Sequence, residues 1–284
     1  MIRASAADVP EISDFLHRHI AGSMFPLTNL LSHGIIGAGA PAPHPRAQRI
    51  WFRRQAGAIT DVLALTDEGA ALPQLAGGDI DGAVSVLRGR SLVGILGQAE
   101  QVSALRNGLG LRQARCRIDH DEPHFTLALC DLILPDLTGA RLIPLSDAPR
   151  ALVTRWCADY EVEALDTPFG EAQAEAARDI AAYLAKDSHR VLLVDDTPVA
   201  MTGFNATLPQ AVQIGGVYTP PALRGRGHAR AAVAMHLIEA RAAGASLGIL
   251  FAASAMAARA YTALGFRQIG HYNLTFFDGP QRVG

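Results

Sequence analysis

A short loop rich in glycine and arginine constrains this chain more than any other feature. Residues 223–230 read Leu-Arg-Gly-Arg-Gly-His-Ala-Arg and lie between an apolar, strand-like run at residues 212–218 and a helical pattern at residues 229–243. A loop in this position directs unpaired backbone N–H groups toward the start of a helix, where the helix dipole also favours negative charge. Gly225 and Gly227 allow close approach to the backbone, and the arginines attract anions. The loop therefore predicts a phosphate-binding site.

Three phosphate-binding motifs compete for this loop. The dinucleotide fingerprint G-x-G-x-x-G/A fits the two glycines, but its third small residue falls on Arg230. The P-loop requires Gly-Lys-Ser/Thr, and the only lysine of the chain is the distant Lys186. The remaining motif, R/Q-x-x-G-x-G/A, is met by Arg224, Gly227 and Ala229. It resembles the coenzyme A pyrophosphate loop of the GNAT superfamily of N-acetyltransferases.

A second segment resembles the same superfamily. Residues 254–266 carry a tyrosine seven residues beyond the first position and end in Gly-Phe, as GNAT enzymes do, but Ser254 stands where the family has asparagine. The resemblance implies that Tyr261 is the general acid that protonates the leaving thiolate of coenzyme A. It also implies that Ser254 contacts the pantetheine arm with a shorter reach or not at all. The structural alternatives are that Tyr261 is a half-buried aromatic residue and that His228 is an exposed loop side chain.

The resemblance implies acetyl-CoA as cosubstrate, in a cleft between the strand that ends at Thr219 and a strand at residues 247–252. Backbone groups of residues 217–219 would align the pantetheine and polarise the thioester carbonyl. Gly215 and Gly216 predict a β-bulge that splays the two strands, and the structural alternative is an irregularity of an edge strand. The expected cofactor-binding residues are Val217, Tyr218, Thr219, Arg224, Gly225, Arg226, Gly227, His228, Ala229 and Ser254.

An acceptor amine is mostly protonated at neutral pH and needs a base. Glu161, Glu163 and Glu171 lie in the helical region that borders the acceptor side in GNAT proteins. Each is a candidate base, although each is also typical of a solvated helix charge, and deprotonation through water is equally admissible. No Ser-His-Asp arrangement and no His/Cys cluster with metal-ligand spacing is readable, so no metal is expected.

Composition excludes several other classes of protein. The 25 Lys and Arg residues and 27 Asp and Glu residues give a formal charge of −2, so we expect no nucleic-acid partner. No run approaches the roughly 18–20 apolar residues that span a bilayer, and the N-terminus lacks the features of a signal peptide. The 3 cysteines form no C-x-x-C pair. We therefore expect a cytoplasmic protein that does not associate with membranes.

The length and the turn-rich stretches predict two domains, residues 1–137 and 138–284. In the second, the patterns follow the order βααβββαβαβ, which matches the GNAT fold. The fold class is then α/β (α+β), with a central mixed, mostly antiparallel sheet flanked by helices. Its expected strands are residues 141–145, 190–194, 197–207, 212–218, 247–252 and 266–277, and its expected helices begin at Asp147 and span 171–185, 229–243 and 255–264.

The first domain starts in the same way, with a strand and an amphipathic helix from Asp8. Residues 35–46, rich in glycine and proline, are expected to form a loop. Strands are expected at residues 49–53, 59–65, 70–75, 91–97 and 125–134, and a helix at 98–107. We interpret the chain as a tandem of GNAT-like domains with a degenerate first copy. Residues 92–98 occupy the place of the phosphate loop without its motif, so this domain is expected to complete the acceptor cleft or to form an interface and to bind no second coenzyme A.

These features together predict an N-acetyltransferase in which a primary amine of a small molecule or of a peptide N-terminus attacks acetyl-CoA directly. The competing hypothesis is a non-catalytic protein that binds coenzyme A or acyl-CoA and acts in regulation or interaction. Ser254 in the asparagine position favours that alternative, whereas Tyr261 and the complete pyrophosphate motif favour an enzyme. A homodimer is compatible with the sequence.

Overall fold

The computed structural model describes residues 1–37 and 44–284. The chain forms two compact units: unit 1 contains Met1–Glu122 and Gly270–Gly284, and unit 2 contains Pro123–Ile269. The expected division lay between residues 137 and 138, whereas these units divide between Glu122 and Pro123 and the C-terminal segment belongs to unit 1. The expected loop at residues 35–46 lies partly outside the described residues.

Unit 1 is built on a mixed sheet in which the strand order is β1-β2-β3-β4-β5-β12. Among these strands β4 and β5 pair in parallel, and β12 pairs antiparallel with β5. Its elements are β1 (Ile2–Arg3), α1 (Val9–Arg18), α2 (Ile20–His33), β2 (Gln48–Gln55), β3 (Ala58–Thr66), β4 (Ala70–Gln74), α3 (Ile80–Leu87), β5 (Ser91–Gln98), α4 (Ala99–Gly108) and the parts of β6 (Cys116–Ala128) and β12 (Arg267–Arg282) that lie within its bounds.

Unit 2 has a sheet with the strand order β6-β11-β10-β9-β8-β7. Again one pair, β10 and β11, is parallel, and the other pairs are antiparallel. Its remaining elements are β7 (Ala140–Pro144), α5 (Arg150–Ala164), α6 (Phe169–Lys186), β8 (His189–Val194), β9 (Thr197–Leu208), β10 (Ala211–Tyr218), α7 (His228–Ala242), β11 (Leu247–Phe251) and α8 (Ala255–Thr262).

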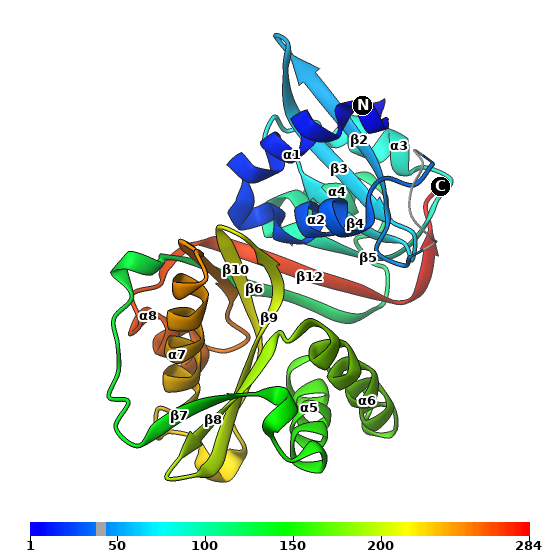
Figure 1. Cartoon of the computed structure of the whole chain (residues 1–284). Helices are drawn as coiled ribbons and strands as arrows, with labels where there is room; N and C mark the ends of the chain where they lie inside the picture. Colours follow the sequence, from blue (N-terminus) through cyan, green and yellow to red (C-terminus); the bar gives the residue numbers. More distant parts are fainter. Residues whose placement is uncertain (38–43) are drawn as a thin grey trace. The chain divides into compact units, whose positions relative to one another are not determined.

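The core of unit 2 lies on both faces of this sheet. Alternate residues of a strand point to opposite faces, so Val191 of β8 packs with α5 and α6 while Leu192 packs with α7. Figure 1 shows α5 and α6 on one face and α7 on the other. The two faces together supply the buried apolar area that stabilises the unit.

The two units share one architecture. From β1 to α4 and from β7 to α8 the elements follow the same order, βααβββαβα, and in each unit the third strand of the βββ run pairs in parallel with the strand that follows the next helix. The sequence-based prediction of a tandem fold with mixed, mostly antiparallel sheets is therefore confirmed.

Several elements differ from their expected positions. The helix expected from Asp147 begins at Arg150, because Asp147 lies in a 3₁₀ turn and Pro149 holds the N-cap position. The strand expected at 125–134 ends at Ala128, opposite the first residue of its partner β11. The patterns also missed α2, which contains Pro26, and α3, which contains Gly82 and has its N-cap at Asp79.

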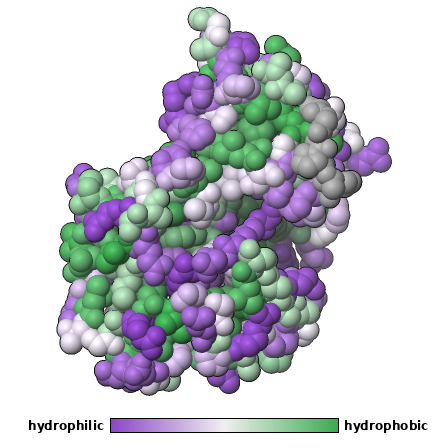
Figure 2. All heavy atoms as spheres, viewed as in Figure 1, coloured by the Kyte–Doolittle hydropathy of each residue, from purple (hydrophilic) through white to green (hydrophobic). Residues whose placement is uncertain are grey.

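Polar and apolar side chains are mixed over the surface. Hydrophilic and hydrophobic residues are interspersed over the face shown in Figure 2. No helix in the described part of the chain is both long enough and apolar enough to cross a membrane. The large apolar side chains that are exposed are those of Ile2, Leu31, Ile133, Leu134, Phe169, Met256 and Ile269.

His189 and His236 are among the buried histidines of unit 2, with exposed fractions of 0% and 2%. Their burial disfavours the protonated imidazole and lowers the pKa of each from 6.5 to about 3. Positively charged Arg190 lowers both pKa values further. Both rings are consequently neutral in the folded protein at neutral pH.

We expect the free energy of unfolding to fall as the pH is lowered below 6.5. Between that value and the depressed pKa of about 3, the unfolded chain binds more protons than the folded one, so acid favours unfolding. Each histidine should contribute about 2 kcal/mol to the loss between pH 7.5 and pH 5. Urea denaturation at both pH values should therefore show a smaller loss for His236→Leu than for wild type; equal losses would contradict the assignment.

Candidate active site

The parallel strands β10 and β11 separate at the centre of unit 2. Their pairing runs from Ala211 opposite Leu247 to Ile214 opposite Leu250, while β10 continues to Tyr218. The register of β10 against β9 shifts between Gly215 and Tyr218, and Gly216 has a φ of +60°. The β-bulge predicted at the two glycines is confirmed. It leaves the last residues of β10 without a ladder partner on the β11 side, where an extended ligand can lie.

The glycine-rich loop opens the N-terminus of α7. Gly225 and Gly227 have φ values of +78° and +83°, and Gly227 is the N-cap residue. No side chain accepts a hydrogen bond at this cap, and a Cβ placed on Gly225 would meet no atom within 4 Å. The first N–H groups of a 15-residue helix therefore face an accessible position where an anion such as a pyrophosphate fits.

The corresponding position in unit 1 is closed by the protein itself. Helix α3 has its N-cap at Asp79, whose carboxylate accepts a hydrogen bond of 3.2 Å from Gly82 N, and Asp61 accepts one of 3.2 Å from Asp79 N. These carboxylates place negative charge where a phosphate would otherwise lie. The helix start in unit 1 is thus unsuited to a second anion.

The separation between β4 and β5 in unit 1 is also filled. Gln101 Oε1 accepts a hydrogen bond of 2.8 Å from Leu75 N, just beyond the end of β4. The Gln101 amide in turn donates to Gln98 Oε1 at 3.1 Å. The Gln101 side chain therefore occupies a backbone N–H at the end of β4, whereas the last residues of β10 in unit 2 have no ladder partner on the β11 side.

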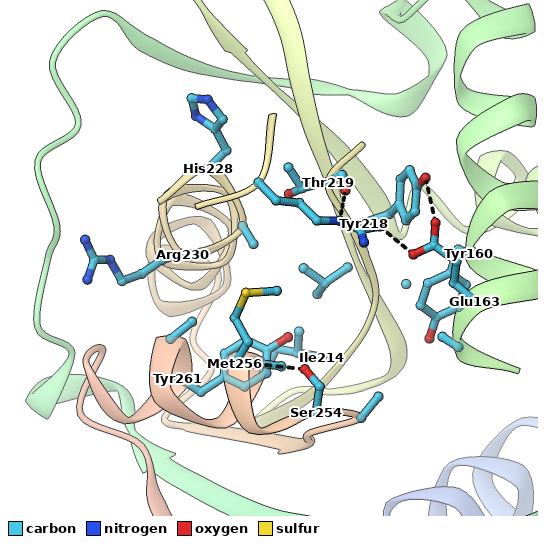
Figure 3. Close-up of a pocket in the computed structure, with 18 of the residues that line it drawn as sticks. Tyr160, Glu163, Ile214, Tyr218, Thr219, His228, Arg230, Ser254, Met256 and Tyr261 are labelled. Atoms are coloured by element: carbon cyan, nitrogen blue, oxygen red, sulfur yellow. Dashed lines mark hydrogen bonds and ion pairs between the residues drawn. The ribbon is translucent and has the colours of Figure 1, made fainter. Parts of the chain in front are cut away.

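A cavity of about 560 Å³ connects the separated strands, the loop and α8 in unit 2. Figure 3 shows side chains from α5, β10, α7 and α8 around it. Ten of the eleven residues predicted for the site line it: Val217, Tyr218, Thr219, Arg224, Gly225, Gly227, His228, Ala229, Ser254 and Tyr261. Arg226 is the exception: it is exposed and does not line the cavity.

Tyr261 and Ser254 enter the cavity from α8. Tyr261 is 7% exposed and makes an edge-to-face contact with Phe266, with ring centroids 6.1 Å apart, so its ring is fixed by packing. Ser254 is the N-cap of α8, and its Oγ accepts a hydrogen bond of 3.1 Å from Ala257 N. This capping role was not predicted from the sequence. Ser254 keeps a hydroxyl proton that can be donated to a ligand.

The opposite wall is formed by α5 and carries charge. The guanidinium of Arg224 forms an ion pair with Glu163, and its Nε donates a hydrogen bond of 2.8 Å to Thr219 O. The Tyr218 hydroxyl lies 3.4 Å from carboxylate oxygens of both Asp159 and Glu163, as Figure 3 shows for Glu163. Burial, followed by these carboxylates, raises the pKa of Tyr218 to about 12. The Arg224 side chain is thus turned toward α5.

The three glutamates proposed as bases lie in different places. Glu163 lines the cavity. Glu161 is 5% exposed, accepts a hydrogen bond of 2.7 Å from Thr167, and has a raised pKa because of its burial, but it does not line the cavity. Glu171 is exposed on α6 and is also absent from the lining. Of the three, only Glu163 can meet a ligand in this cavity.

Tyr160 and Met256 also line the cavity and were missed by the sequence analysis. Tyr160 is half-buried on α5, whereas the neighbouring Glu161 is buried. The spacing of three between Tyr160 and Glu163 places both on one face of α5 and could have indicated a shared wall. No local signal identifies Met256. No group of three or more His, Cys, Asp or Glu side chains within residues 1–37 and 44–284 is arranged to hold a metal ion.

We expect Glu163→Gln to tighten binding of acetyl-CoA by about two- to five-fold. The substitution releases Arg224 from a partly exposed ion pair, an interaction worth up to about 1 kcal/mol, so the guanidinium becomes available to the phosphates of the ligand. Calorimetric titration of the wild type and the variant measures the change. Weaker binding by the variant would contradict the idea that the ion pair competes with the ligand.

Comparison with known proteins assigns this unit to a family. Residues 151–266 match the model of the acetyltransferase (GNAT) family. They include the loop, both strands of the cleft and most of α5, so unit 2 contains a GNAT acetyltransferase domain. No curated protein sequence matches the chain.

Solved structures resemble the chain over nearly its whole length. A protein from Drosophila matches with a TM-score of 0.61 and 13% identity, covering 96% of this chain and 97% of its own. A GCN5-related N-acetyltransferase from Sphaerobacter thermophilus matches with a TM-score of 0.52 and 17% identity, covering 96% and 93%. A tandem GNAT protein from the clavulanic acid biosynthesis pathway matches with a TM-score of 0.51 and 16% identity, covering 99% and 98%. At these identities the likeness concerns the fold.

Proposed function

We propose that unit 2 binds acetyl-CoA and transfers its acetyl group to a primary amine. The observation that carries this proposal is the uncapped start of α7, which opens into the same cavity as the separation between β10 and β11. The start of α7 suits a pyrophosphate, and the separation between β10 and β11 suits the extended pantetheine arm with its amide groups. The GNAT assignment of residues 151–266 supports the same cosubstrate.

The backbone of this chain performs the binding and polarisation. N–H groups at the start of α7 hold the phosphates, with Gly225 and Gly227 permitting close contact. Backbone groups of Val217 to Thr219 align the arm and stabilise the negative charge that develops on the carbonyl oxygen. Acetyl-CoA supplies an acetyl group activated as a thioester. Holding both reactants in one cavity lowers the entropic cost of their reaction.

Tyr261 supplies the proton that the reaction needs at sulfur. As the amine nitrogen bonds to the carbonyl carbon, the carbon–sulfur bond breaks, and the Tyr261 hydroxyl protonates the departing thiolate. The ring contact with Phe266 keeps the hydroxyl in position. The proton lost by the amine passes through water or to Glu163 once Arg224 has turned toward the phosphates.

An assay of thiol release tests this function. Purified protein with acetyl-CoA would be mixed with four kinds of primary amine, namely an aliphatic diamine, an amino sugar, an amino acid and a peptide with a free N-terminus. We expect at least one class to accelerate release of free thiol and to gain an acetyl group by mass spectrometry. Tight binding of acetyl-CoA with no turnover for any amine would instead favour the non-catalytic alternative.

A further inference from the structure

His189 lies beneath the bulge that opens the cleft of unit 2. It is the first residue of β8 and pairs opposite Gly203 of β9, which in turn pairs opposite Gly215 of β10. Its side chain is 0% exposed and does not line the cavity, although Gly215 and Gly216 do. The imidazole therefore reaches across β9 to the strand that borders the cleft.

Two glycines make room for this ring. A Cβ added to Gly203 would overlap the imidazole, and a Cβ added to Gly216 would lie only 2.6 Å from Nε2 of His189. Real Cβ atoms do not approach other atoms so closely, so a side chain at either position would displace the ring or the strand. The ring fills the space that both glycines leave on this face of the sheet.

The other sides of the ring are held as well. Tyr183 of α6 stacks on His189 with ring centroids 3.5 Å apart and an interplanar angle of 16°. The Ser188 hydroxyl lies 2.9 Å from Nδ1. Nε2, the atom nearest the Cβ position of Gly216, is buried without a hydrogen-bond partner, which is unfavourable for stability. Stability alone does not explain a histidine here.

We propose that His189 is a positioning residue that holds the β10 bulge in the shape required for acyl-CoA. Packed between Tyr183 and Gly216, the ring prevents the bulge from collapsing toward the helices α5 and α6. Val217 to Thr219 then keep their backbone groups directed into the cleft. The inference rests on the proposed function, because the positioned segment is the one that would hold the thioester.

Amide hydrogen exchange of the ligand-free protein tests the packing role. We expect His189→Ala to speed exchange at residues 215–218 by at least about ten-fold, because the bulge loses its support and opens locally. Exchange in β2 and β3 of unit 1 serves as the internal control. Unchanged exchange at residues 215–218 would overturn the proposal, whether or not the protein binds acetyl-CoA.

A double-mutant cycle tests the link to ligand binding. Gly203→Ala, outside the cavity, pushes the ring toward the bulge and should weaken acetyl-CoA binding by about ten-fold or more. In the His189→Ala background the added methyl group has room, so Gly203→Ala should weaken acetyl-CoA binding by less than about three-fold. Gly170→Ala, where a Cβ meets no atom within 4 Å, is the matched control.

Equal weakening by Gly203→Ala in both backgrounds would overturn the proposal. If the wild type itself bound no acetyl-CoA, the proposed function would fail, and the exchange experiment would still decide whether His189 supports the bulge.

Discussion

Gly227→Glu is expected to weaken binding of acetyl-CoA by at least about 100-fold. The new carboxylate would lie at the uncapped start of α7, where it repels the pyrophosphate and can itself accept the N–H groups of the helix. Unit 1 already shows this arrangement in Asp79. Calorimetric titration with acetyl-CoA and with free coenzyme A measures the loss, since both ligands carry the same pyrophosphate.

Gly57→Glu is the matched control for this prediction. Gly57 lies in the exposed turn between β2 and β3, has a φ of +84° against +83° for Gly227, and has no atom within 4 Å of its Cβ position. Both substitutions therefore add the same charge and the same backbone strain. We expect the control to bind acetyl-CoA as the wild type does. Equal affinities for the two variants would remove the start of α7 from the site.

Tyr261→Phe is expected to lower kcat by about 100-fold while leaving the Kd for acetyl-CoA within about three-fold of wild type. A positioned general acid contributes roughly 10²–10⁴ in rate, whereas the ring itself and its contact with Phe266 survive the substitution. The same assay on Tyr272→Phe controls for loss of a buried hydroxyl, because Tyr272 is 1% exposed and absent from the cavity lining.

The separation of kcat from Kd decides the role of Tyr261. Loss of affinity with unchanged kcat would make the hydroxyl a binding group. An unchanged kcat and Kd would make Tyr261 a packing residue of α8, which is the structural alternative raised by the sequence.

The sequence predicts the site wherever a local segment determines its own geometry. Gly225 and Gly227 adopt positive φ values that favour glycine, so the loop and the start of α7 follow from residues 223–230. The glycine pair in β10 likewise marks its own bulge. Residues 254–266 place Tyr261 because the distance along a short helix is fixed.

Interactions between distant segments could not be read in the same way. Whether Arg224 faces a ligand or Glu163 depends on how α5 packs, 61 residues away along the chain. Glu161 and Glu163 look equivalent in the sequence, but a rotation about the helix axis buries one and leaves the other in the cavity. Strand pairing is equally non-local, so the assignment of residues 270–284 to unit 1 required the fold.

Helix α3 was not predicted because its local sequence has low helix propensity, and the helix is stabilised by packing against the rest of unit 1. α3 is eight residues long and contains Gly82, which lowers its intrinsic helix propensity. Its buried residues Ala83, Val84 and Leu87 pack in the core of unit 1. Burial of this kind stabilises a helix that its propensity alone would not.

The number of acetyl-CoA molecules that one wild-type chain binds distinguishes one cofactor site from two. The uncapped α7 and open strands of unit 2, together with the Asp79 cap and the Gln101 amide of unit 1, predict a single site. Calorimetric titration should therefore saturate at about one equivalent, with the signal lost in Gly227→Glu. Saturation at two equivalents, or no binding at all, would contradict the account.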